Sequence, residues 1–64
     1  MLDINVDDSG SMFLFTPLTQ AAREWVDAHL NLDGWQWIGY GFAVDSRFAG
    51  TIAEGMASDG LRVG

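Results

Sequence analysis

The segment from Gly34 to Val44 limits the choice of fold more than any other part of this chain. It holds two of the three tryptophans, the single tyrosine and three of the eight glycines. Glycine is unfavourable inside a strand unless the chain bends or another backbone comes close. We therefore predict a loop or a bulged lead-in over residues 35–39, followed by a strand over residues 40–44.

Two extended segments near the N-terminus predict a β-hairpin. Apolar residues at positions 2, 4 and 6 alternate with polar ones, which is typical of a strand with one apolar face. Residues 12–15 are apolar throughout, as in a strand covered on both sides. The small polar residues at 8–11 favour a turn between the two strands.

The apolar second strand has two faces, and the choice between them decides which side chains stay free. We expect helices to cover the face that carries Met12 and Leu14. Phe13 and Phe15 would then point away from the helices and need another cover.

Two further segments have the three- and four-residue spacing of amphipathic helices. Thr16-Pro17 favours a helix start, and this helix would run to about Leu30. The second helix would begin at Asp45-Ser46, where either side-chain oxygen can provide the cap, and end near Gly60, which can adopt a left-handed turn. Residues 61–63 leave room for one short edge strand.

The second helix also contains Gly50 and Gly55. Each glycine weakens a helix by about 1 kcal/mol relative to alanine. We therefore expect the helix to pack closely against a neighbour at these positions.

These elements predict a single α+β domain over residues 1–64, a small two-layer sandwich in the order β-β-α-β-α-β. Two amphipathic helices would lie on one face of a mostly antiparallel sheet. A domain this short is near the lower limit for folding alone, so part of its stability often comes from disulfides, metals or oligomerisation.

Composition and charge exclude several classes of function. The three basic residues, all arginine, stand against nine acidic ones, which gives a net charge of −6. Nucleic acids and anionic membranes are bound through clustered lysine and arginine, so neither is an expected partner. The chain has no cysteine, which removes disulfides and thiolate metal sites.

Localisation follows from what the sequence lacks. The N-terminus has no basic region followed by an apolar run, and no apolar stretch is long enough to cross a membrane. We expect a cytoplasmic protein.

Metal and catalytic chemistry find little support in the residues. Residues 3–7 repeat the Asp-x-Asn-x-Asp start of a calcium loop, but Asp8 stands where that loop needs glycine and Leu14 where it needs glutamate. His29 is the only histidine, too few for a zinc site, and no serine lies in a nucleophile setting. We expect no enzyme activity, no metal and no cofactor.

The apolar content suggests a surface for another protein, because 48% of the residues are hydrophobic. We predict an aromatic patch formed by Trp35, Trp37, Tyr40, Phe13 and Phe15. We predict an acidic rim formed by Asp7, Asp8, Asp27 and Asp33. Two alternatives remain: the tryptophans fold over the sheet as a lid, or a homodimer buries the patch.

Several short segments of the sequence resemble those of other small proteins. Phe-Leu-Phe-Thr-Pro-Leu-Thr at 13–19, Trp25-Val26, and the ending from Ala53-Glu54-Gly55-Met56 to Asp59-Gly60-Leu61 resemble small proteins of about this length encoded by bacteria and their phages. The resemblance covers nearly the whole chain, includes no catalytic motif and brings no known activity. It implies a bacterial or phage origin.

Taken together, these features predict a small acidic protein-binding module without catalytic activity. A phage or plasmid origin would suit an inhibitor of a host nucleic-acid enzyme that acts through charge mimicry. The alternative is a structural homodimer or an accessory subunit, in which the charge serves solubility alone.

Overall fold

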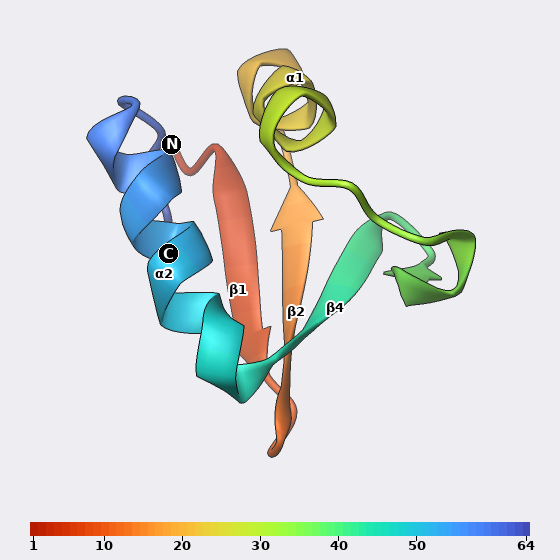
Figure 1. Cartoon of the computed structure of the whole chain (residues 1–64). Coiled ribbons are helices and arrows are strands. Elements are labelled where there is room, and N and C mark those ends of the chain that lie inside the picture. Colours follow the sequence, from red (N-terminus) through yellow and green to blue (C-terminus); the bar gives the residue numbers. More distant parts are fainter.

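The computed structural model describes the backbone of residues 1–64 and every side chain except that of Trp35. Its elements, shown in Figure 1, are β1 (Ile4–Asp8), β2 (Met12–Pro17), α1 (Gln20–His29), the 3-10 turn η1 (Gly34–Gln36), β3 (Trp37–Ile38), β4 (Gly41–Asp45) and α2 (Ser46–Ser58). This arrangement confirms the α+β class and the general order of elements.

The four strands form an antiparallel sheet in the order β1-β2-β4-β3. β1 and β3 are thus its two edges. The short edge strand predicted over residues 61–63 is reduced to one parallel bridge, in which Val63 lies opposite Ile4. Backbone hydrogen bonds extend this contact: the Ile4 N–H donates to the Arg62 carbonyl (3.2 Å), and the Gly64 N–H donates to the Ile4 carbonyl (3.1 Å).

Both helices pack on one face of this sheet, and their buried residues form one core with those of the strands. Its members are Ile4, Phe15, Ala22, Val26, Phe42, Val44, Ala49 and Met56. Phe15 stacks on Phe42 with ring centroids 5.5 Å apart and planes 17° apart. The two aromatic rings therefore lie at the centre of the sandwich.

The predicted choice of face was wrong. Phe15 is 0% exposed, and the helices cover its face rather than that of Leu14. The register explains this result, because Val6 lies opposite Phe15 whereas Asp7 lies opposite Leu14. Cross-strand partners share a face of the sheet, so the Phe15 face is the continuous apolar one.

The predicted start of the first helix was also wrong. Pro17 ends β2 opposite Ile4, and α1 begins at Gln20. The residue before a proline is driven to extended backbone, which keeps Thr16 in the strand. Thr19 provides the cap instead, since its Oγ1 accepts a hydrogen bond from the Ala22 N–H (3.2 Å).

Asp3, near the N-terminus, links the start of α1 to the C-terminal segment through hydrogen bonds. Its carboxylate accepts hydrogen bonds from the Thr19 hydroxyl (2.8 Å) and from the Arg62 N–H (2.9 Å). Hydrogen bonds from the Arg62 backbone, followed by that from Thr19, hold the pKa of Asp3 below its ordinary value.

Both ends of α2 confirm the sequence analysis. The Asp45 side chain accepts from the Arg47 N–H (2.9 Å) at the start of the helix. At the other end Gly60 has a φ of 92°, and the Leu61 N–H donates to the Met56 carbonyl (3.0 Å). These are the hydrogen bond and the left-handed residue of a glycine-terminated helix.

The two glycines of α2 differ. A Cβ at Gly55 would lie 3.4 Å from Cζ2 of Trp25, so the predicted close packing is confirmed there. A Cβ at Gly50 would have no atom within 4 Å, so the same prediction was wrong at that position.

Candidate functional site

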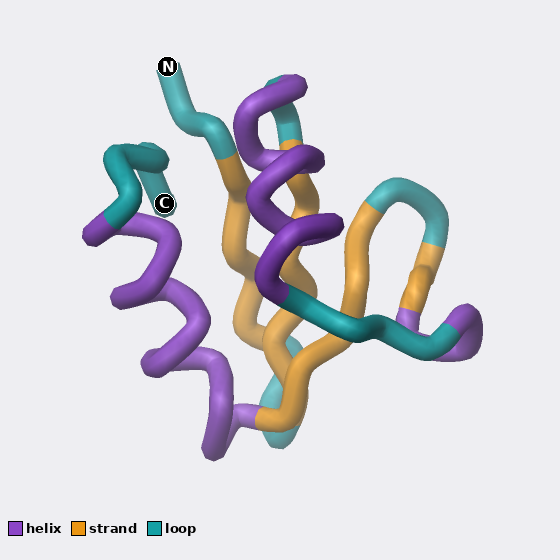
Figure 2. Tube along the Cα trace, turned by 45° about the horizontal axis from the view of Figure 1, so that its top comes forward, coloured by secondary structure: helices purple, strands orange, loops and turns teal.

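The β3–β4 hairpin carries three of the large apolar side chains that are exposed in the described chain. Its strands pair Trp37 with Phe42 and Ile38 with Gly41, which leaves Gly39 and Tyr40 as a two-residue turn. Gly39 has a φ of 64°, the positive value that a tight hairpin needs at its first turn position. The loop predicted over residues 35–39 thus contains the last two residues of the 3-10 turn and the short strand β3. Figure 2 shows the hairpin at the side of the molecule away from α2.

Gly41 allows the hairpin to lie against β2. A Cβ at this position would lie 2.8 Å from Thr16 Oγ1, 3.0 Å from the Phe15 carbonyl oxygen and 3.1 Å from Leu14 Cδ1. Only glycine fits such an approach without displacing the neighbouring strand. The glycine noted in the sequence therefore marks a close contact between β4 and β2.

Three side chains of the hairpin reach solvent. Tyr40 is 90% exposed, Ile38 61% and Trp37 39%. Trp37 is fixed by an edge-on contact with Phe42, with centroids 5.4 Å apart and planes at 68°. The predicted aromatic patch is therefore reduced. Trp37 and Tyr40 lie together on the hairpin, whereas the side chain of Trp35 lies outside the described residues.

The other two aromatic residues do not join them. Phe15 is buried between the sheet and the helices, so its predicted role as a partner contact is wrong. Phe13 is half-buried and packs against the core from the same face. It borders a cavity of about 190 Å³ between β1, β2 and α2.

The acidic rim does not form a continuous ring around the hairpin. Asp33 is exposed beside it, and its N–H donates to Oε1 of Gln36 (2.9 Å) at the 3-10 turn. Asp7 and Asp8 are exposed at the end of β1, which is the opposite edge of the sheet from β3. Asp27 is exposed on α1. The fold therefore places one of the four carboxylates next to the hairpin.

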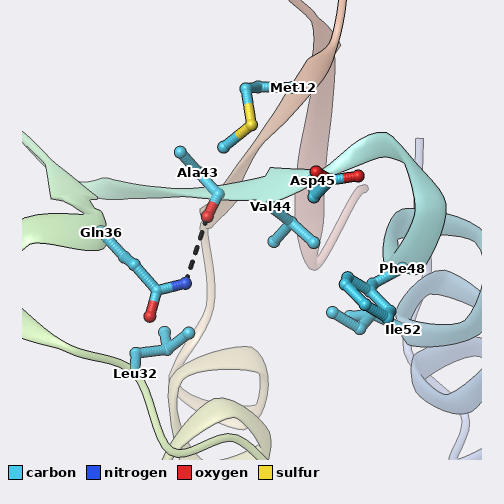
Figure 3. Close-up of a pocket in the computed structure, with 8 residues that line it drawn as sticks. All are labelled: Met12, Leu32, Gln36, Ala43, Val44, Asp45, Phe48 and Ile52. Carbon is cyan, nitrogen blue, oxygen red and sulfur yellow. Dashed lines mark hydrogen bonds between the residues drawn. The ribbon is translucent and has the colours of Figure 1, made fainter.

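Sequence reasoning missed an apolar groove of about 500 Å³ between the 3-10 turn and α2. Its lining residues are Met12, Leu32, Gln36, Ala43, Val44, Asp45, Phe48 and Ile52. Figure 3 shows Leu32 and Gln36 on one side and Phe48 and Ile52 on the other. The four-residue spacing of Phe48 and Ile52 indicates one apolar helix face, but Phe48 is 57% exposed.

One carboxylate and one amide supply the polar groups of the groove. Nε2 of Gln36 donates to the Ala43 carbonyl (3.4 Å) at the outer edge of β4. The Arg47 backbone N–H, followed by the Arg47 side chain, lowers the pKa of Asp45, whose Oδ1 lies 3.1 Å from Nε of Arg47. The Arg47 guanidinium also lies 5.5 Å from the centre of the Phe48 ring.

The only histidine belongs to a contact between the two helices. The His29 ring stacks on Trp25 with centroids 4.4 Å apart, and its Nε2 lies 3.6 Å from Oδ2 of Asp59. The same carboxylate accepts a hydrogen bond from Trp25 Nε1 (2.6 Å). Among the side chains that the structure describes, no three histidine, aspartate or glutamate residues gather as metal ligands would.

Comparisons with known proteins find no match: no family model, no curated protein and no solved structure is significantly similar to this chain. Neither α1 nor α2, the two helices of the described chain, has the length and hydropathy required to span a bilayer.

Proposed function

We propose that this chain is a small protein-binding module without catalytic activity, and that the β3–β4 hairpin contacts the partner. The observation that carries the proposal is the exposure of Tyr40, Ile38 and Trp37 on one β-hairpin. Tyrosine and tryptophan are the residues that most often dominate the energy of protein interfaces.

The charge of the chain favours a basic partner. A net charge of −6 without any lysine attracts positively charged surfaces and speeds their association. Enzymes that act on nucleic acids present such surfaces where they hold phosphates. An inhibitor of a host enzyme of this kind, encoded by a phage or plasmid, is the specific form of the proposal, and it has a cytoplasmic site of action.

The test compares three forms of the protein as bait in an extract of the cells that carry the gene. Tyr40→Ser removes the most exposed hairpin side chain, and Leu18→Ser removes an exposed apolar side chain elsewhere. We expect wild type and Leu18→Ser to retain the same protein and Tyr40→Ser to lose it. Raising salt from about 0.1 M to about 1 M shortens the Debye length from about 10 Å to about 3 Å and should weaken retention. Equal retention by all three forms would refute a role for the hairpin.

A homodimer is the second candidate, and one observation favours it. The sheet face opposite the helices has no covering layer in the described chain, and it carries the half-buried Met12, Leu14 and Ala43. A second copy could cover this face. The mass in solution across a dilution series tests this candidate: a dimer that Leu14→Glu converts to a monomer would support it, and a monomer at all concentrations would exclude it.

A further inference from the structure

We infer that the groove beside β4 receives an apolar side chain from a basic segment of the partner protein. This inference rests on the proposed function, because it specifies which chemistry that partner presents. The hairpin and the groove lie on either side of Gln36, which directly precedes Trp37 and lines the groove. One partner could therefore contact both.

The shape and lining of the groove suit an apolar anchor. Its volume of about 500 Å³ is within the range of about 300–1,000 Å³ that is typical of binding pockets. Figure 3 shows Val44 between the Leu32 and Phe48 sides, so aliphatic and aromatic carbon lines most of the groove. Burying a leucine or phenylalanine of the partner here would remove apolar surface of both proteins from water.

The charges around the groove select a basic segment. Asp45 lines it, and Asp33 is exposed next to Gln36. Arg47 is hydrogen-bonded to Asp45 through Nε (3.1 Å), so each of these two charges is partly neutralised by the other and Asp33 carries the uncompensated charge. Of the two other arginines, Arg23 lies in α1 and Arg62 beside β1. Lysine or arginine next to the anchor would meet the Asp33 carboxylate on a chain of net charge −6, whereas aspartate or glutamate would be repelled.

The same charges argue against a second copy of this chain as the occupant. Each copy has a net charge of −6, and the only basic residues it could offer are three arginines. Two copies joined at this groove would bring the Asp33 and Asp45 carboxylates of one chain toward another acidic chain. Like charges at an interface weaken association.

The experiment selects random linear peptides displayed on phage against the folded wild-type protein. We expect the enriched peptides to share an apolar residue flanked by lysine or arginine. The peptide with the highest affinity is then synthesised and added to the protein. The amide NMR signals of Ala43, Phe48 and Ile52 should shift. A second peptide with glutamate in place of each basic residue should bind at least about tenfold more weakly.

Two matched variants locate the site. Phe48→Ser removes an exposed ring, and serine and phenylalanine have similar helix propensities, so the fold should persist. We expect this variant to weaken the peptide by about tenfold or more, as for an anchor pocket. Leu18→Ser, which alters an exposed leucine outside the groove, should leave the affinity unchanged. A thermal unfolding curve for each variant confirms that it is folded.

The outcomes separate this inference from the proposed function. Enrichment without a basic-apolar pattern, shifts outside the groove, or equal weakening by Phe48→Ser and Leu18→Ser would overturn the groove assignment. No enrichment at all would overturn it as well. None of these results affects the hairpin proposal, which depends on capture by wild type and loss in Tyr40→Ser. Loss of capture only in Phe48→Ser would instead support the groove and refute the hairpin.

Discussion

Two glycine-to-alanine substitutions should change the stability of this protein in opposite directions. Each adds one methyl group, at Gly41 in β4 or at Gly50 in α2. At Gly41 the new Cβ would lie 3.0 Å from the Phe15 carbonyl oxygen. That oxygen belongs to the central sheet and cannot rotate away as a side chain could. At Gly50 no atom lies within 4 Å.

The magnitudes follow from these surroundings. Forcing a methyl group into the closed space at Gly41 costs about 1–3 kcal/mol, partly offset by about 0.4–1 kcal/mol from the stiffer unfolded chain. We expect a net loss of about 1–2 kcal/mol. Gly50→Ala should gain about 1 kcal/mol, because alanine is the better helix former and nothing opposes it.

Urea unfolding followed by tryptophan fluorescence, together with calorimetry, measures both effects. For a domain of this size each kcal/mol shifts the Tm by about 4–8 °C, so Gly50→Ala should raise the Tm and Gly41→Ala should lower it by at least about 4 °C. A Gly41→Ala protein as stable as wild type would show that β4 does not approach β2 as described. A Gly50→Ala protein no more stable than wild type would show that the space beside Gly50 is not open.

Three further predictions test the core, the contact between the helices and the response to acid. Phe15→Ala should cost about 3–5 kcal/mol and unfold much of the protein, whereas Leu14→Ala on the uncovered face should cost less than about 2 kcal/mol; far-UV circular dichroism measures both. Asp59→Ala removes the acceptor for Trp25 Nε1, and we expect a loss of about 1 kcal/mol with a red-shifted tryptophan emission. Asp3 has a lowered pKa in the fold, so its stabilisation is present above the ordinary carboxyl pKa and is lost as the pH falls through the folded value. Urea unfolding of Asp3→Asn should therefore vary less with pH below about 4 than that of wild type, and an identical pH dependence would contradict this assignment.

The sequence by itself determined the elements whose causes lie within a few residues. The cap of α2, predicted at Asp45 or Ser46 and found at Asp45, and the Gly60 turn both depend on hydrogen bonds between near neighbours. The aromatic segment was predicted only in part: the strand expected over residues 40–44 corresponds to β4, but the short strand β3 and the turn at Gly39 and Tyr40 were not predicted. The same reasoning predicted the α+β class, because hydrophobic periodicity reports which side of each element is apolar.

Only the tertiary structure decided which face of β2 is covered. Residues 12–15 are apolar at every position, so their own pattern does not distinguish Phe15 from Leu14. The choice depends on the register with β1, which places Val6 opposite Phe15 and Asp7 opposite Leu14. A shift of one residue would exchange the two faces, and no local signal specifies that register.

The groove was hidden from the sequence for the same reason. Its walls come from the segment before β3 and from α2, and the repeat of Phe48 and Ile52 indicates an apolar helix face without showing how far the sheet extends beneath it. The edge strand β3 is too short to continue the sheet beside the second half of β4, because it pairs only with Gly41 and Phe42. Phe48 therefore remains exposed at the edge of the sandwich. Whether a side chain is buried at this edge depends on whether a neighbouring element reaches it, and the sequence pattern of the helix does not report that distance.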